Sequence, residues 1–308
     1  MLKPAVPFAM LNDGDDQRRD IAQASVAAGL GNQRRRRLTD LLPRVVSSLV
    51  LATAALTATW RGGTLFAVTW FVASLAVGWE WQNLIGAARA RLRVLILAAA
   101  LALASYFATR GDFAAACGVL AFAGLLAGLA AGRGRELWAF AGILYAGALI
   151  ISVNVLYASP VFGSRAIFWL FATVWGTDVF AYFGGRLIGG PKLWPQISPS
   201  KTWSGTLCGV LAGALIGALI GARGLSDARV ALPIFALGLV TALVAQGGDL
   251  VESIVKRRFG VKDSGSLIPG HGGFMDRLDG FLAAAAFAAL FGALHGIPNA
   301  AAALFDWL

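Results

Sequence analysis

The chain has 308 residues, of which 58% are hydrophobic and only 14% are charged, and its mean hydropathy is +0.71. This composition excludes an ordinary soluble globular domain. Its net charge of +10 does not require a nucleic-acid partner as its explanation. Basic residues beside membrane spans also set the orientation of the spans and attract anionic lipid headgroups. Cys117 and Cys208 lie far apart in apolar segments, so we expect neither a disulfide framework nor a cysteine metal site.

The apolar stretches predict an all-α, polytopic integral membrane protein with about nine transmembrane helices. Residues 1–43 are polar and lack the apolar core of a signal peptide, which indicates a disordered cytosolic tail. Each later stretch approaches the roughly 20 residues that a helix needs to cross a bilayer. The predicted spans are residues 44–60, 64–85, 93–109, 113–132, 137–158, 166–185, 205–222, 230–250 and 277–296.

Basic residues indicate the orientation of these spans. With the N-terminus in the cytoplasm, most of the 26 basic residues fall in cytoplasmic segments, as the positive-inside rule expects. The five on the opposite side are Arg61, Arg110, Arg165, Arg223 and Arg229.

The N-terminal transmembrane helices, residues 44–160, carry few ionisable groups inside the spans. Glu80, between two tryptophans near the inner end of its helix, is interpreted as an interfacial belt residue rather than a catalyst. Residues 161–308 are predicted to form a catalytic membrane domain with cytoplasmic loops over 186–204 and 251–276. Asp178, a carboxylate within a span, is a candidate for substrate binding.

The seventh span carries a glycine at every fourth position, from Gly205 to Gly221. This spacing is typical of close helix packing rather than of a nucleotide-binding loop. The loop before it contains Ser198, Lys201 and Thr202. On residue types alone, this loop is either a phosphate contact or a rigid turn at the membrane surface.

A dense polar cluster between Ser253 and Asp279 is the main candidate for chemistry. Asp249, Ser253 and Lys256 share a face of the eighth helix by spacing, and Asp276 and Asp279 share a face of the ninth. Carboxylates with many cations fit magnesium and phosphate chemistry, although a solvated loop with local ion pairs is the alternative. The other residues of the cluster are Arg257, Arg258, Lys262, Asp263, Arg277 and the glycine-flanked His271.

The glycines beside His271 allow a ligand to approach the backbone closely. The ninth helix starts just afterwards and is expected to offer free N–H groups to an anion. We therefore include Gly272 and Gly273 among the substrate-binding residues.

These motifs resemble the signature of the phosphatidate cytidylyltransferases, also called CDP-diacylglycerol synthases. The resemblance covers about residues 175–281 and rests on Ser253–Arg257, Lys262-Asp263, Pro269–Gly273 and Asp276–Asp279. Similar segments are Asp178–Gly185, Ser198–Trp203 and Gln246–Leu250. The family often has a lysine at the position of Ser200 and an acidic residue at that of Ser204, so no charged role is carried over to either.

The resemblance implies Mg²⁺-dependent transfer from CTP to phosphatidate, giving CDP-diacylglycerol and pyrophosphate, in a multi-pass protein of the inner (cytoplasmic) membrane. It also implies a homodimer, an active site facing the cytosol, and Asp249 and Asp276 as metal ligands, with a Mg²⁺ and K⁺ pair as one arrangement. The alternatives are a CTP-dependent polyprenol or lipid kinase and a membrane transporter. The catalytic residues expected are Lys256, Arg257, Lys262, Asp263, His271, Arg277 and Asp279.

Overall fold

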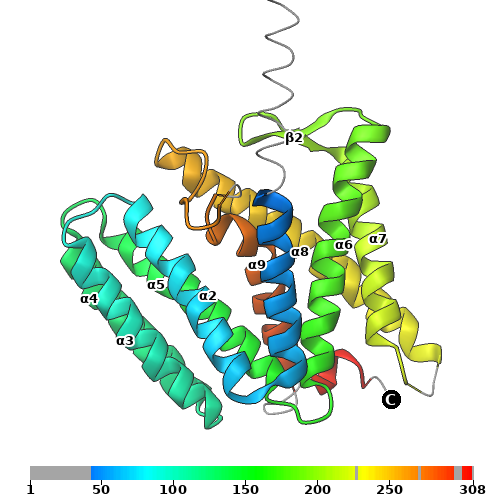
Figure 1. Ribbon diagram of the computed structural model, residues 1–308, viewed down its shortest axis with the longest axis horizontal. Helices are drawn as coiled ribbons and strands as arrows, with labels where there is room; N and C mark the ends of the chain where they lie inside the picture. Colours follow the sequence, from blue (N-terminus) through cyan, green and yellow to red (C-terminus); the bar gives the residue numbers. More distant parts are fainter. Residues whose placement is uncertain (1–42, 226–227, 270–271, 295–299, 307–308) are drawn as a thin grey trace, which may run out of the picture. The chain divides into compact units, whose positions relative to one another are not determined.

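The computed structural model describes residues 43–225, 228–269, 272–294 and 300–306. The predicted cytosolic tail and His271 therefore lie outside the described residues. Within the described ranges the chain forms nine α-helices, one small hairpin and two short 3₁₀ helices (Figure 1). The helices are residues 43–61, α2 (Gly63–Leu84), α3 (Ala90–Thr109), α4 (Phe113–Ala131), α5 (Glu136–Tyr157), α6 (Gly163–Leu187), α7 (Trp203–Gly221), α8 (Ala231–Arg258) and α9 (Met275–Ala293).

A helix overlaps each of the nine predicted apolar stretches, and the prediction of an all-α, multi-pass membrane protein is confirmed. α8 differs most, because it continues to Arg258 and into the loop predicted over 251–276. Within the described part of the chain, seven helices, α2 to α8, are long and apolar enough to cross a bilayer. Their ends carry local stop and start signals. Asp112 accepts a hydrogen bond from the Ala115 amide at 3.0 Å and caps α4, and Gly132 follows α4 with φ of 81°, a conformation that suits glycine.

The loop between α6 and α7 contains the only strands in the described ranges. β1 (Lys192–Trp194) pairs antiparallel with β2 (Ser198–Thr202), with Lys192 opposite Thr202 and Trp194 opposite Ser198. Figure 1 shows this hairpin at one end of the α6 and α7 pair. It lies inside the loop predicted over 186–204, and it brings Lys201 to the start of α7.

The glycine stripe of α7 packs against α6, as its spacing predicts. A Cβ atom at Gly205 would lie 2.7 Å from the Ala181 carbonyl oxygen, and one at Gly209 would lie 2.8 Å from the Ala181 Cβ. A Cβ at Gly213 would lie 2.6 Å from the Thr173 carbonyl oxygen. Because these distances are below van der Waals contact, the two helices can approach this closely only where α7 has no side chains.

A buried aromatic stack joins α2, α6 and α9. The Trp70 ring lies 5.0 Å from the Phe281 ring and 6.2 Å from the Phe171 ring, and the Phe171 and Phe281 rings are 5.1 Å apart, all stacked. All three side chains are buried. The N-terminal helices are therefore packed directly onto helices that carry the polar cluster.

Candidate active site

An ion pair between Lys201 and Asp249 joins the hairpin to α8. The Lys201 Nζ lies 2.6 Å from the Asp249 Oδ2 and also donates to the Gln246 Oε1 at 3.0 Å. On the other side of Asp249, the Ser253 hydroxyl lies 3.4 Å from its Oδ1. A lysine and a carboxylate that are distant in the sequence thus meet at one end of the helices.

Asp178 and Asp279 face the same charges. Asp178, exposed on α6, interacts electrostatically with Asp249, Lys201 and Arg277. Asp279, half-buried on α9, interacts with Asp249 and Asp178, and its Oδ1 accepts a hydrogen bond from the Gly280 amide at 2.7 Å. Three helices and the hairpin therefore contribute to one polar region, as the sequence pattern predicted for α8 and α9.

Lys256 links α8 to α9 through two carboxylates. Its Nζ lies 2.6 Å from the Glu252 Oε2 and 2.7 Å from the Asp276 Oδ1. Glu252 is 1% exposed, so this carboxyl is shielded from water, and Lys256 is the cation that contacts it. The prediction that the ends of α8 and α9 meet is confirmed by this pair of contacts.

Asp276 is held by donors from three segments. Besides Lys256, the Gly273 amide donates to its Oδ2 at 2.9 Å, and the Ser264 amide and hydroxyl each donate at 3.0 Å. Burial raises the pKa of this carboxyl, but hydrogen bonds with Glu252, Lys256 and the two backbone amides outweigh that effect and lower the pKa to about 2. Asp276 is therefore ionised throughout the neutral range.

Glu80 of α2 holds the start of α9, and its interpretation as an interfacial belt residue is wrong. It is 1% exposed and accepts hydrogen bonds from the amides of Phe274 at 3.0 Å and Met275 at 2.8 Å. The Ser264 hydroxyl, whose single proton is shared between Glu80 and Asp276, lies 3.1 Å from the Glu80 Oε2. A carboxylate at a helix N-terminus satisfies amides that have no partner within the helix.

The same contacts correct a second expectation. Amides at the start of α9 were expected to be free for an anion, but the Met275 amide, the first of α9, and the Phe274 and Gly273 amides just before it donate to Glu80 and Asp276. The anion at this helix terminus is therefore supplied by the protein itself. Gly273 has no room for a side chain, because a Cβ there would collide with the Ser264 hydroxyl and the Glu80 carboxylate.

The remaining predicted residues are more dispersed. Arg257, Lys262 and Asp263 are exposed, and among the described residues none of them forms an ion pair. Arg257 donates to the Val261 carbonyl at 3.1 Å. Their place in the site stays a prediction.

Two residues of the hairpin and one glycine have structural contacts. The buried Thr202 hydroxyl accepts from the Gly205 amide at 3.1 Å and caps α7, while Ser198 is half-buried in β2. Gly272 has φ of 85° and its carbonyl accepts from the Ile268 amide at 2.9 Å. Substrate contacts by these three residues remain predictions.

The donor chemistry of the region fits a bound cation. Acidic side chains outnumber basic ones in the linked set, which comprises Asp178, Asp249, Glu252, Asp276 and Asp279 with Lys201, Lys256 and Arg277. In the described part of the chain, no three ligating side chains converge on one point. Mg²⁺, however, is commonly bound by one or two carboxylates together with waters and substrate phosphates.

The two predicted metal ligands differ in availability. The Asp249 side chain is 34% exposed, and in the described part of the chain its hydrogen-bonding partners are Lys201 and, at a longer distance, Ser253. The Asp276 side chain is 7% exposed and its oxygens already accept from three residues. Asp249 therefore fits a metal ligand as it stands, whereas Asp276 would have to exchange a protein donor.

Sequence reasoning missed the roles of Glu80, Glu252 and Ser264. Glu252 precedes Lys256 by four residues, a spacing that favours an ion pair on a helix, so a signal was present. Ser264 and Glu80 are 184 residues apart, and nothing local in the sequence indicates their contact.

Comparison with known proteins agrees with the family resemblance seen in the sequence. The family model described as "Cytidylyltransferase family" matches residues 42–295. The chain is 41% identical over 276 residues to the phosphatidate cytidylyltransferases of Brucella abortus (strain 2308) and Brucella suis biovar 1 (strain 1330), covering 87% of this chain and 99% of each relative. It is 40% identical over 124 residues to that of Bacillus subtilis (strain 168), covering 39% of this chain and 45% of that protein.

Proposed function

We propose a catalytic arrangement from the premise that this chain belongs to the cytidylyltransferase family. By homology it is a phosphatidate cytidylyltransferase, a nucleotidyltransferase that forms CDP-diacylglycerol and pyrophosphate from CTP and phosphatidate. The observation that carries the arrangement is the 2.6 Å ion pair between Lys201 and Asp249. It brings the hairpin and α8 together beside Asp178, Asp279 and Arg277.

The reaction requires positioning and charge stabilisation more than a special nucleophile. A phosphate oxygen of phosphatidate forms a bond to the α-phosphorus of CTP, and the bond from that phosphorus to the pyrophosphate oxygen breaks. A phosphate monoester is already a competent nucleophile at neutral pH. The side chains therefore have to align two anionic substrates and offset the charge of the departing pyrophosphate.

The cations of the site divide by their surroundings. Lys201 and Arg277 border the region of Asp178 and Asp249, so they can contact the leaving pyrophosphate or the lipid phosphate. Lys256 is fixed between two carboxylates and holds Asp276 in place. In this arrangement Lys256 also faces the triphosphate of CTP.

Two exposed cations, Arg257 and Lys262, follow at the end of α8 and in the connection to α9. They are available to bind the outer phosphates of CTP. We assign Asp263 and Asp279 to orienting neighbouring cations, and a catalytic role for His271, which lies outside the described residues, stays a prediction.

Asp249 and Asp276 are the residues that we assign to Mg²⁺, with K⁺ as a second ion of the pair. When bound, Mg²⁺ supplies positive charge to substrate phosphates. The half-exposed carboxylate of Asp249 is accessible to the ion. Asp276, ionised and held by Ser264 and Gly273, adds a second carboxylate from α9.

In the membrane, we propose nine spans with the N-terminus in the cytoplasm and the active site at the cytosolic face of the inner membrane. The distribution of basic residues supports this orientation. The acidic start of α9 and the polar end of α8 then lie at the surface where CTP is dissolved and phosphatidate is embedded. We propose that the enzyme works as a homodimer.

The test is an assay of purified protein with CTP, phosphatidate and Mg²⁺, scoring the lipid product and pyrophosphate. Asp249→Asn and Asp276→Asn should each lower kcat by about 100-fold or more, the range for lost electrostatic stabilisation. Asp112→Asn, at the exposed cap of α4, is the matched control and should retain activity.

Near-normal Mg²⁺-dependent turnover by either folded variant of the site would refute its metal assignment. Release of CDP in place of pyrophosphate would instead indicate a CTP-dependent lipid kinase. Substrate transport without either product would indicate a transporter.

A further inference from the structure

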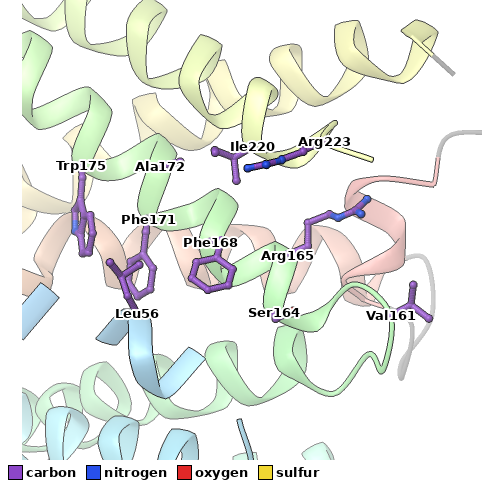
Figure 2. Close-up of a pocket in the computed structure, with 10 residues that line it drawn as sticks. All are labelled: Leu56, Val161, Ser164, Arg165, Phe168, Phe171, Ala172, Trp175, Ile220 and Arg223. Atoms are coloured by element: carbon purple, nitrogen blue, oxygen red, sulfur yellow. The ribbon is translucent and has the colours of Figure 1, made fainter. Parts of the chain in front are cut away.

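A groove of about 530 Å³ lies beside the first half of α6, away from the polar cluster. Figure 2 shows Phe168, Phe171 and Leu56 along it, with Trp175 toward one end and Arg165 and Arg223 toward the other. Arg165 and Asp178 are 13 positions apart on α6, which is roughly 20 Å along the helix axis. The groove is therefore separate from the candidate active site.

The two arginines of the groove have few partners among the residues that the structure describes. Among the described residues, no carboxylate lies within ion-pair distance of either one. The Nη1 of Arg165 is buried and has no hydrogen-bond partner there, although its guanidinium lies 5.3 Å from the centre of the Phe162 ring. A buried guanidinium N–H without an acceptor is costly, so an anion at this position would be stabilising.

Membrane topology does not account for these arginines. Arg165 and Arg223 lie at the end of the helices that is predicted to be extracytoplasmic, where the positive-inside rule disfavours basic residues. Both residues line the apolar groove, Arg165 from the start of α6 and Arg223 from just after α7. A guanidinium binds phosphate through paired hydrogen bonds, and the aromatic lining suits an acyl chain.

We propose that this groove binds an anionic phospholipid from the leaflet opposite the active site. Arg165 and Arg223 hold its phosphate, and one acyl chain lies along Phe168 and Phe171. Basic pockets between transmembrane helices recognise phospholipid headgroups in this way. The lipid would brace α6 against α7, the pair that presents Asp178 and the hairpin.

The experiment measures lipid retained by the full-length protein. Protein purified in mild detergent is titrated with phosphatidylglycerol, which is not a substrate, and the bound fraction is determined by native mass spectrometry. Phosphatidylcholine, a fatty acid and inorganic phosphate are the comparison ligands. Wild type should bind phosphatidylglycerol at least about tenfold more tightly than phosphatidylcholine, a difference of about 1.4 kcal/mol.

Arg165→Gln combined with Arg223→Gln should remove this preference. Arg110→Gln, a basic residue on the same predicted side that does not line the groove, should keep it. Ala172→Leu, which adds volume inside the groove, should weaken phosphatidylglycerol and fatty acid alike. If the double variant does not fold, Arg223→Gln alone is used, because Arg223 is exposed. This single substitution should lower the affinity for phosphatidylglycerol several-fold.

The proposal is overturned if wild type shows no preference for phosphatidylglycerol, or if removing the arginines leaves the preference intact. Binding of inorganic phosphate as tightly as of the lipid would show an anion site without an acyl component. Since the readout is lipid binding, it is independent of the catalytic assay.

Discussion

Glu80→Gln tests whether the N-terminal helices position the active site. Glu80 provides two oxygens for three donors, the Phe274 and Met275 amides and the Ser264 hydroxyl, at 2.8 to 3.1 Å. Glutamine keeps the shape but replaces one oxygen with an NH₂ group. At least one amide at the start of α9 then faces a donor instead of an acceptor.

The expected cost follows from these contacts. A buried donor without a partner costs about 1–3 kcal/mol, and loss of the negative charge beside a helix N-terminus adds about 0.3–1 kcal/mol. We therefore expect the free energy of unfolding to fall by about 1–4 kcal/mol. Because Ser264 also donates to Asp276, kcat should fall as well.

The assay is equilibrium unfolding in mixed micelles, followed by kinetics of the folded fraction. Glu136→Gln is the matched control: Glu136 lies exposed in the first turn of α5, so only a small helix-dipole effect of about 0.3–1 kcal/mol is expected. A Glu80→Gln protein with the stability and kcat of wild type would refute the positioning role. A loss of stability alone, with kcat unchanged, would limit Glu80 to folding.

Two further substitutions test the packing and the ion pairs. Gly213→Leu should destabilise the protein by about 3 kcal/mol or more, because the added side chain must separate α7 from α6. Gly118→Leu is the control and should be near neutral, since a Cβ at Gly118 meets nothing within 4 Å. Equal shifts in the melting temperature of the two variants would contradict the packing explanation. Lys256→Met removes the cation between Glu252 and Asp276, and the lost charge-assisted hydrogen bonds should lower the free energy of unfolding by about 1.5–3 kcal/mol together with most of the activity. Arg258→Met, at an exposed position, should change neither, and an active, stable Lys256→Met protein would show that the linked carboxylates do not need this cation.

The helices and the glycine contact were predictable because they depend on local sequence. Crossing a bilayer requires a continuous apolar segment whose own backbone hydrogen bonds are satisfied, so the spans could be located without knowing their neighbours. A glycine every four residues on α7 likewise indicates a face that packs closely. The residue types around Asp249 and Asp276 favoured phosphate chemistry, and the resemblance of the motifs to a known signature predicted the family.

The contacts within the site depended on the tertiary structure. Lys201 meets Asp249 because the hairpin folds onto α8, and Glu80 reaches α9 because α2 packs against it; neither contact follows from helical periodicity. The expectation of free amides at the start of α9 was wrong because its acceptor comes from a helix almost 200 residues away. Sequence determined which groups the membrane helices carry to their ends, and packing decided which of those groups are already paired and which are available to substrate.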